Sequence, residues 1–319
     1  MLLGLSTGKT DCLPTTAYLM TYTRNKCTAN CAFCPQARES RGQTDSLSRV
    51  TWPIFNVTKT IERLFDAIEE EKAKRVCIQA LNYPQMIEDV TALISKIREC
   101  RKTRVSVSCQ PRNKSNIIRL KESGIERIGI PLDASTKDLF DRIKGGSAGG
   151  PYTWEEQLRL LREATAVFGK GNVSTHLIVG LGETEKDLVR IIQRCHDAGV
   201  LPGLFAFTPI LGTILEHSQP PSLDAYRRIQ LARLLIVEER TAFKNFIFDR
   251  DGKIACFGVQ PEELAKTIHE GEAFRTSGCP DCNRPYYNER PSGPVYNYPR
   301  TLTDEEVASI RWQFKSHAS

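Results

Sequence analysis

Long apolar runs are missing from this sequence of 319 residues. A helix that spans a membrane needs about eighteen or more consecutive apolar residues, and no stretch approaches that length. We therefore expect no transmembrane segment. The N-terminal stretch MLLGLSTGKTD also has too short an apolar core for a secretory signal peptide. Eleven cysteines without such a leader indicate a reducing compartment, so we expect the protein to be cytoplasmic.

Runs of basic residues are also missing, although 44 Lys and Arg against 38 Asp and Glu give a net charge of +6. The basic residues are dispersed along the chain. A dispersed, weakly basic surface is more typical of ordinary solubility than of nucleic-acid binding, and it would also suit an acidic protein substrate. We therefore expect no nucleic-acid partner.

The most specific pattern is a cysteine triplet, Cys27, Cys31 and Cys34, which directly follows an apolar run. Three thiolates at C-x3-C-x2-C spacing can hold three corners of a [4Fe-4S] cube, because soft sulfur ligands favour iron-sulfur centres and zinc. The fourth iron would then be open to a small molecule, whereas a structural zinc site normally has a fourth protein ligand. The alternatives are a zinc site completed by a distant residue and three unrelated core cysteines.

This triplet, with Phe33 before its last cysteine, resembles the cluster motif of the radical S-adenosylmethionine (SAM) enzymes. The resemblance implies that the amino and carboxylate groups of SAM bind the open iron of a [4Fe-4S] cluster. It also implies that reductive cleavage of SAM gives a 5′-deoxyadenosyl radical, and that Phe33 packs near the adenine.

Strand-like and helix-like stretches alternate along the chain in six units. We predict strands at 16–23, 75–80, 104–109, 126–132, 172–179 and 203–208, and helices at 52–72, 85–98, 115–122, 154–168, 185–198 and 223–239. Six such units indicate an α/β fold with parallel strands and right-handed crossovers, in a barrel or an open sheet. The resemblance favours the partial (β/α)6 barrel of the superfamily, in residues 1–243. Residues 244–319 are predicted to form a C-terminal extension with a hairpin at 246–256 and a helix at 261–268.

The ends of the strands supply further candidates, because chemistry in parallel barrels occurs at the C-terminal ends of the strands. Asp133 closes the fourth strand, where its carboxylate could accept hydrogen bonds from ribose hydroxyls or cap a helix from Ser135. The Gly-Gly-Glu motif that often follows the second strand in the superfamily is missing. Gln79 and Asn82 stand there instead and are our candidates for holding the methionine amine.

The fifth and sixth strand ends resemble SAM-binding segments of the superfamily. Gly180, Gly182 and Glu183 resemble the segment beside SAM in biotin and lipoyl synthases. Phe207 and Pro209 follow the sixth strand, where the family usually lays backbone against the adenine.

A second cysteine pattern, Cys279 and Cys282, has C-x2-C spacing in a loop rich in Pro, Tyr and Arg. Such a pair is typical of a metal knuckle that needs further ligands. A redox pair is less favoured because prolines surround a turn here, whereas the reactive pair of thioredoxins opens a helix. Two structural thiols are the remaining alternative. If the pair holds a second cluster, Cys77 and Cys109 on the second and third strands are candidate ligands, with Cys256 as a competitor.

For several other residues the sequence leaves two roles open. His176 faces substrate or is packed in the core, and Arg284, Tyr286 and Tyr287 line a channel or form a solvated loop. The glycine-rich stretch 145–150 is a plain linker or a lid, with the linker favoured. Two more cysteines fall within predicted helices and are interpreted as structural thiols: Cys100 and Cys195.

Arg75-Val-Cys77 and Val107-Ser-Cys109 resemble the strands that carry auxiliary-cluster cysteines in biotin synthase, but Ser174 stands where that enzyme has its next cysteine. The closest whole-chain resemblance, from residue 14 to residue 300, is to the archaeal "biotin synthase-related" radical proteins. These are subunits of the two-protein lipoyl synthase. The motifs that carry this resemblance are Cys-Pro-Gln-Ala-Arg at 34–38 and Thr-Ser-Gly-Cys-Pro-Asp-Cys-Asn-Arg-Pro at 276–285.

The resemblance implies sulfur insertion into an octanoyl chain on a lysine of a carrier protein. An auxiliary [4Fe-4S] cluster would be consumed as the sulfur source. The implied partners are a second, related radical SAM subunit, an electron donor such as ferredoxin, and the octanoylated carrier, either a glycine-cleavage H protein or a dehydrogenase lipoyl domain. Two other hypotheses are a radical enzyme of a small molecule, biotin synthase-like or otherwise, with a structural C-x2-C, and a non-enzymatic metal carrier.

Overall fold

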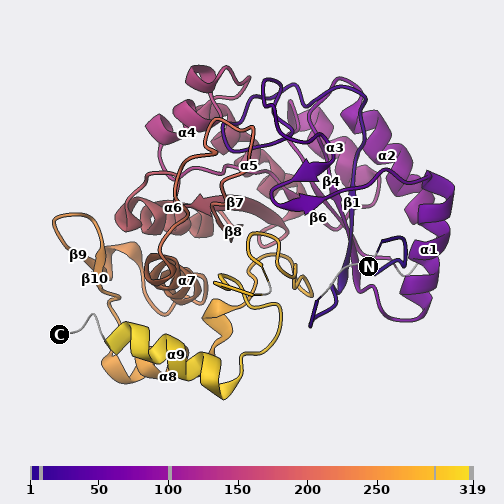
Figure 1. The fold of residues 1–319 in the computed structure, drawn as a ribbon. Helices are drawn as coiled ribbons and strands as arrows, with labels where there is room; N and C mark the ends of the chain where they lie inside the picture. The colour runs from indigo at the N-terminus through magenta and orange to yellow at the C-terminus, as the bar shows by residue number, and fades with distance from the viewer. Residues whose placement is uncertain (1, 7–9, 100–102, 291, 316–319) are drawn as a thin grey trace.

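A six-stranded parallel sheet forms the centre of the computed structural model, which describes residues 2–6, 10–99, 103–290 and 292–315 (Figure 1). The strand order follows the chain, β1-β4-β5-β6-β7-β8, as expected when each strand is joined to the next by a crossover helix. The strands are β1 Thr16–Met20, β4 Arg75–Gln79, β5 Val105–Ser108, β6 Arg127–Gly129, β7 Val173–Val179 and β8 Val200–Ala206.

Amphipathic helices cover the outer face of this sheet (Figure 1). Helix α6 illustrates how the sequence defines them. The Thr184 hydroxyl accepts a hydrogen bond from the backbone N–H of Asp187, and the Asp187 carboxylate accepts one from the backbone N–H of Thr184, which forms a capping box. Its apolar stripe, which includes Leu188 and Ile192, is buried against the sheet. The helices are α1 Val57–Glu69, α2 Met86–Ile97, α3 Lys114–Glu122, α4 Lys137–Ile143, α5 Trp154–Phe168, α6 Glu185–Asp197 and α7 Leu223–Val237.

The sheet has two edges, β1 and β8, and residues 275–289 run along both. We call these residues the C-terminal segment. The hydroxyl of Ser277 accepts a hydrogen bond from the N–H of Leu204 on β8, at 2.8 Å. The amide oxygen of Asn283 accepts one from the N–H of Thr15, just before β1, at 2.9 Å. The C-terminal segment therefore covers the open side of the partial barrel.

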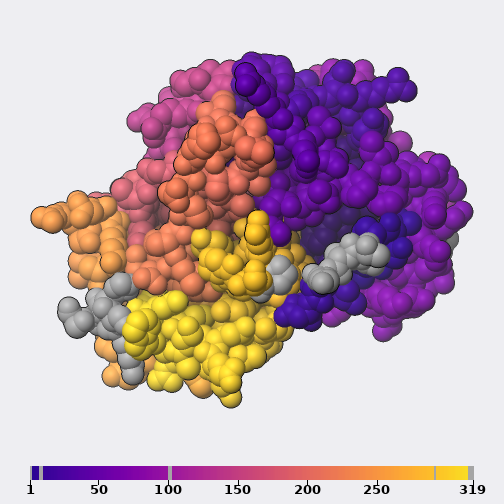
Figure 2. All heavy atoms as spheres, in the orientation of Figure 1, coloured from indigo at the N-terminus to yellow at the C-terminus, as the bar shows by residue number. Residues whose placement is uncertain are grey.

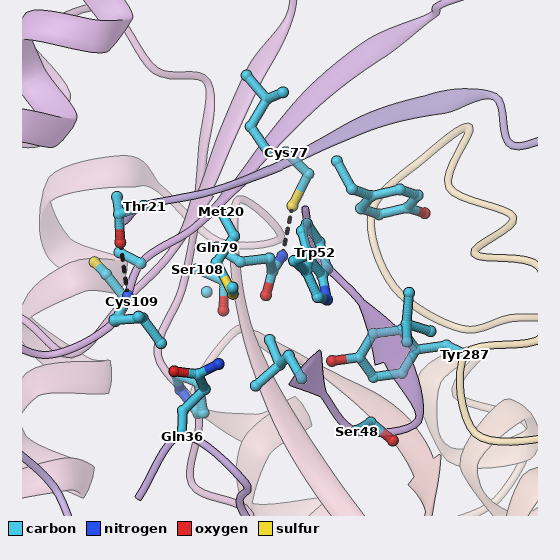
Figure 3. Close-up of a pocket in the computed structure, with 18 of the residues that line it drawn as sticks. Met20, Thr21, Gln36, Ser48, Trp52, Cys77, Gln79, Ser108, Cys109 and Tyr287 are labelled. Carbon is cyan, nitrogen blue, oxygen red and sulfur yellow. Dashed lines mark hydrogen bonds between the residues drawn. The ribbon is translucent and has the colours of Figure 1, made fainter. Parts of the chain in front are cut away.

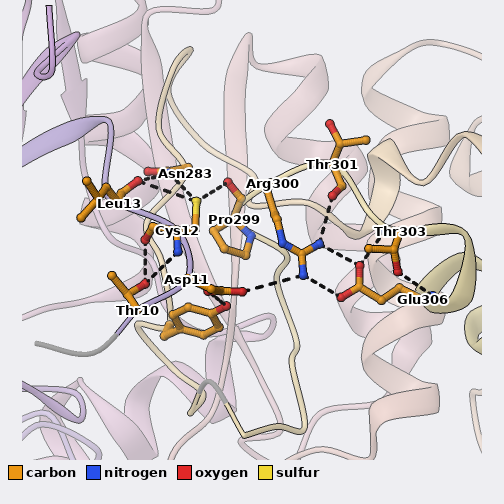
Figure 4. A network of polar contacts seen from close by, with 11 residues as sticks. Thr10, Asp11, Cys12, Leu13, Asn283, Pro299, Arg300, Thr301, Thr303 and Glu306 are labelled. Atoms are coloured by element: carbon orange, nitrogen blue, oxygen red, sulfur yellow. Dashed lines mark hydrogen bonds and ion pairs between the residues drawn. The ribbon is translucent and has the colours of Figure 1, made fainter.

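The remaining C-terminal residues form an antiparallel hairpin and two helices. Their bounds are β9 Ile247–Phe248, β10 Ile254–Cys256, α8 Pro261–Glu270 and α9 Asp304–Lys315. Figure 4 shows how the start of α9 is fastened to the N-terminal residues: the Arg300 guanidinium lies between the carboxylates of Asp11, at 3.8 Å, and Glu306, at 2.9 Å. In the space-filling view the yellow C-terminal residues lie against the indigo start of the chain (Figure 2).

The predicted fold class, an α/β partial barrel with parallel strands, is confirmed. Two elements were missed, a short hairpin of β2 Ser46–Leu47 and β3 Val50–Thr51 and helix α9, whereas the helix considered from Ser135 is α4. The hairpin strands have two residues each, too few for an alternating pattern to show. Helix α1 begins at Val57, later than predicted, because Asn56 caps it. No helix in the described ranges is long and apolar enough to cross a membrane.

Candidate active site

A cavity of about 1230 Å³ occupies the barrel, and residues of the strands, the cysteine loop and the β2–β3 hairpin line it. Ligand pockets usually hold roughly 300–1000 Å³, so this one has room for a nucleotide-sized cofactor and part of a second molecule. Figure 3 shows Met20, Gln79 and Ser108 projecting into it from neighbouring strands, with Trp52 and Tyr287 on the opposite wall. The C-terminal segment therefore forms part of the cavity wall.

The strand register arranges the side chains inside the cavity in rows. Met20, Gln79 and Ser108 are register partners on β1, β4 and β5, near the ends where the strands stop. Two residues earlier, a second row joins Tyr18, Cys77 and Ser106 and continues to Arg127 on β6. Because side chains two residues apart share a face of a strand, both rows face the interior, one below the other.

The cysteine loop follows β1 at the C-terminal ends of the strands, which we call the upper end of the barrel. Active sites of parallel barrels lie at this end. The N–H of Cys27 donates to the carbonyl of Gln36 at 3.0 Å, and the N–H of Cys34 donates to the carbonyl of Cys31 at 3.0 Å. The N–H of Asn82 donates to the Cys27 sulfur at 3.3 Å. These bonds hold the three thiols on one short loop that lines the cavity.

The chemistry of these thiols fits an iron-sulfur cluster. Burial raises the pKa of Cys34 to about 12 and that of Cys31 still further, so both are neutral unless a cation replaces the proton. In the described part of the chain, no three Cys, His, Asp or Glu side chains converge on one metal-ion position. A cubane does not need such convergence, since each cysteine binds a different iron.

Asp133 forms a buried ion pair at the same end of the barrel. Its carboxylate lies 2.5 Å from the Lys144 ammonium, and the two side chains are 8% and 2% exposed. Lys144 also donates to the carbonyl of Pro131 at 2.5 Å. The alternative role of Asp133 as a helix cap is wrong, because Thr136 caps α4. The predicted contact of Asp133 with ribose stays a prediction.

Three further candidates lie around the cysteine loop. Phe33 lines the cavity and is partly buried, as a residue beside a bound base would be. The Gln79 amide donates to the Cys77 sulfur at 3.0 Å, so it is directed down the barrel and not toward the cysteine loop. The Asn82 amide donates to the Tyr152 hydroxyl at 2.9 Å.

The glycine-rich loop after β7 is held together by the carboxylate of Glu183. Glu183 accepts hydrogen bonds from the N–H groups of Gly180, at 2.6 Å, and Leu181, at 2.9 Å. Gly180 has φ of +103° and lies against Pro221, so a side chain there would clash. Of the other candidates at these strand ends, Phe207 lines the cavity, whereas Gly180, Gly182, Glu183 and Pro209 do not.

A second group of thiols lies deeper in the barrel, away from the cysteine loop, and consists of Cys77, Cys279 and Cys282; we call it the lower thiol group. Cys279 and Cys282 of the C-terminal segment lie near Cys77. Burial, together with the charges of these two neighbours, raises the pKa of the Cys77 thiol to about 12. The Tyr18 hydroxyl lies 3.1 Å from the Cys282 sulfur. The three thiols line the same cavity as the cysteine loop. They supply three of the four ligands that an iron-sulfur cluster usually has, and all three are among the predicted ligands of an auxiliary cluster.

The sequence from residue 21 to residue 195 matches the Radical SAM superfamily. The chain belongs to this superfamily. The predicted cofactors, a [4Fe-4S] cluster with SAM and an auxiliary cluster, agree with this membership and with the relatives below.

Curated relatives of this radical SAM protein include biotin synthases. That of Hydrogenobaculum sp. (strain Y04AAS1) is 27% identical over 220 residues, 66% of this chain and 61% of the relative. That of Synechococcus elongatus is 22% identical over 276 residues, 83% of this chain and 80% of the relative. The match thus spans less than two thirds of the length of the first relative.

Solved structures of the superfamily share the fold. The hydrogenase maturase HydG from Carboxydothermus hydrogenoformans has a TM-score of 0.52 at 17% identity, covering 79% of this chain and 56% of that chain. Methylornithine synthase, PylB, has a TM-score of 0.51 at 15% identity, covering 70% and 63%. At these identities the likeness concerns the fold alone.

Of the remaining cysteines of this radical SAM protein, Cys109 lines the cavity, whereas Cys195 and Cys256 do not. Cys109 is 2% exposed beside Ser108 (Figure 3), burial raises its pKa to about 12, and its predicted role as an auxiliary-cluster ligand stays a prediction. Cys256 accepts a hydrogen bond from the N–H of Gly258, at 3.5 Å, after β10. Cys195 is buried in α6, as expected of a structural thiol, and Cys100 lies outside the described residues.

Sequence reasoning missed three side chains of the site: Lys144, Tyr18 and Arg127. Tyr18 could have been predicted, because it lies two residues before Met20 on a predicted strand and therefore shares its inward face. Arg127 shares a register row with Cys77, which only the sheet pairing shows. Nothing in the sequence sets Lys144 apart from the other dispersed basic residues.

Proposed function

We propose that this radical SAM protein inserts sulfur into the octanoyl chain of an octanoyl-lysyl carrier protein, as one subunit of a two-protein lipoyl synthase. One observation carries the sulfur-insertion part of the proposal. Cys77, Cys279 and Cys282 lie together below the loop of Cys27, Cys31 and Cys34, in one continuous cavity. A reaction that joins a carbon radical to a sulfur needs its two centres at the ends of one enclosed space.

The two thiol groups would hold the two clusters, with Cys27, Cys31 and Cys34 above and Cys77, Cys279 and Cys282 below. When bound, the upper cluster with SAM supplies hydrogen-atom abstraction, and the lower cluster supplies the sulfur. The protein's own task is to orient the alkyl chain between them and to exclude water. Met20, Trp52 and Phe205 give the cavity the apolar walls that an octanoyl chain requires.

The carrier specificity rests on the resemblance and on the shape of the entrance. Ile54, Phe55 and Val57 are exposed beside the β2–β3 hairpin and also line the cavity, so the apolar surface continues from the interior to the outside. A substrate arm attached to a protein needs such an open entrance. The second subunit, the carrier and a donor such as ferredoxin are part of this proposal, as is a cytoplasmic setting, which the ten free thiols described would suit.

A biotin synthase-like reaction on a small molecule is the second candidate. The names of the curated relatives favour it. Ser174 on β7 weighs against the same auxiliary ligand set, because it lines the cavity with a hydroxyl where biotin synthase has a thiol. Both candidates share the sulfur-inserting chemistry and differ in the molecule that enters.

The test is mass spectrometry of an octanoylated carrier protein after anaerobic incubation with the reconstituted enzyme, SAM, a reductant and a related second subunit. We expect a product heavier by sulfur, with loss of hydrogen. A Cys279→Ala/Cys282→Ala variant should cleave SAM without adding sulfur. No mass gain on the carrier, with gain on free dethiobiotin, would replace the lipoyl proposal with the second candidate.

A further inference from the structure

Each thiol of the lower group faces a hydrogen-bond donor. The Gln79 amide donates to Cys77, as described above. The Tyr18 hydroxyl lies 3.1 Å from the Cys282 sulfur and accepts a hydrogen bond from the N–H of Arg284, also at 3.1 Å. A cysteine that binds a cluster is a thiolate without a proton, so the Tyr18 hydroxyl would then be the donor to Cys282.

The third donor is Arg127, a 6% exposed residue at the start of β6. Its two terminal nitrogens are held at the bottom of the barrel, Nη1 by Asn172 at 3.1 Å and Nη2 by the carbonyl of Gly171. Its Nε is buried and has no hydrogen-bond partner among the described residues. The guanidinium lies beside the Cys279 thiol, and its unpaired Nε is the donor left to serve that sulfur.

A second buried cation contacts the backbone next to Cys279. Arg75, at the start of β4, is 2% exposed, and its Nε donates to the carbonyl of Pro280 at 3.3 Å. Its Nη2 forms an ion pair with the Glu126 carboxylate at 2.9 Å, and its Nη1 is buried without a hydrogen-bond partner in the described part of the chain. A buried, unpaired N–H is costly, so the unpaired nitrogens of Arg127 and Arg75 favour an acceptor with negative charge in this region.

The other buried cysteines provide the contrast. Cys109 has no charged group that affects its pKa, and Cys195 has only Arg194 of its own helix. The fully buried Cys109 and Cys195 therefore differ from the lower thiols, although Cys27 and Cys256 also accept hydrogen bonds, from backbone N–H groups.

We propose that Tyr18 and Arg127 are positioning residues of the auxiliary centre, donating hydrogen bonds to the thiolates of Cys282 and Cys279. This inference rests on the proposed function, because it requires a cluster at the lower thiols. Hydrogen bonds to the sulfurs and nearby positive charge favour the more reduced, more negative state of a cluster, so they raise its reduction potential. They also hold the thiolates against exchange with water.

The experiment uses a Cys27/Cys31/Cys34→Ala parent, in which only the auxiliary cluster forms, reconstituted anaerobically. Tyr18→Phe removes one hydroxyl and keeps the ring. We expect a more negative midpoint potential and, on competition with a chelator, about a tenfold shift toward iron loss, the effect of one hydrogen bond to a charged group. The control is Tyr83→Phe, which removes a hydroxyl that donates to Asp89 at 2.9 Å, away from the lower thiols.

Arg127 gives an independent variant pair. Arg127→Met should lower the midpoint potential more than Tyr18→Phe does, and Arg127→Lys should restore part of it, since a charge is returned without the fixed Nε donor. A merely structural role for Arg127 would not make the potential follow the charge.

The outcomes separate this inference from the proposed function. If the parent holds no iron, the proposed function fails and this inference fails with it. If the parent holds a cluster and Tyr18→Phe and Arg127→Met leave its potential and iron retention unchanged, only this inference is overturned. A lowered potential in both variants, with Tyr83→Phe unchanged, supports it.

Discussion

Single residues of this protein carry charge where a barrel interior would otherwise be apolar. Lys144 is the clearest case, because its ammonium is almost fully buried and is satisfied by Asp133 and the carbonyl of Pro131. It also lies over the ring of Tyr152, at 5.3 Å. A charge this far from water persists only when its partners are fixed.

Lys144→Met should therefore destabilise the protein strongly, since it leaves the Asp133 carboxylate buried without a cation. Breaking a buried ion pair from one side costs about 3–5 kcal/mol of unfolding free energy. Urea unfolding measures this loss. Lys137→Met is the matched control, because its pair with Glu155 is exposed and should contribute nothing measurable. Equal losses in both variants would contradict the structural role of the buried pair.

His176 should make stability depend on pH. Burial lowers its pKa to about 4, outweighing nearby Asp133, which acts in the opposite direction, and Arg284 and Lys144 lower it too. The unfolded state, with a pKa near 6.5, binds the proton first as pH falls, so stability is complete above about pH 6.5 and declines toward pH 4.

We expect roughly 2 kcal/mol of unfolding free energy to be lost through this group between pH 7 and pH 5. His176→Gln should reduce the pH dependence by that amount, as measured by urea unfolding at the two pH values. An unchanged pH dependence in the variant would mean that His176 titrates alike in the folded and unfolded states.

At the scale of elements, the β2–β3 hairpin and the C-terminal segment form one wall of the cavity although they are far apart in sequence. The Arg49 guanidinium donates to the carbonyl of Tyr286 at 2.7 Å, and the Asn288 amide donates to the Ser48 hydroxyl at 3.4 Å. The hairpin strands are too short to be stable alone, so we infer that these contacts hold them in place.

Arg49→Ala should loosen both elements together. Hydrogen exchange followed by mass spectrometry should show faster exchange in residues 46–51 and in residues 285–288, with β4 and β5 unchanged. Arg63→Ala, which removes an exposed guanidinium from α1, serves as the control. Faster exchange in the hairpin alone would show that the C-terminal segment is held independently.

The elements also show what the sequence predicts and what it leaves open. The strand at 75–80 and the helix at 185–198 were predicted within a few residues, because alternation and capping are local signals. The association of Cys77 with Cys279 was one of several possibilities, since Cys109 was also predicted as a ligand and Cys256 as a competitor. The choice among them depends on register and on the path of the C-terminal segment, and neither is encoded locally.

For the whole molecule, the central claim is that one cavity has a thiol group at each end. The upper group comes from the loop after β1, and the lower one joins β4 to the C-terminal segment, which covers the open side of the sheet. The barrel and its last residues therefore act as a unit, and removal of the C-terminal segment should abolish the lower group and leave the upper one.

The iron and sulfide content of two anaerobically reconstituted triple variants tests this claim most directly. Cys27/Cys31/Cys34→Ala and Cys77/Cys279/Cys282→Ala should each retain about four irons and four sulfides, the content of one cubane. The second variant should still cleave SAM, and the first should not. If Cys27/Cys31/Cys34→Ala retains essentially no iron, the lower thiols hold no cluster and the account of sulfur insertion by this chain is wrong.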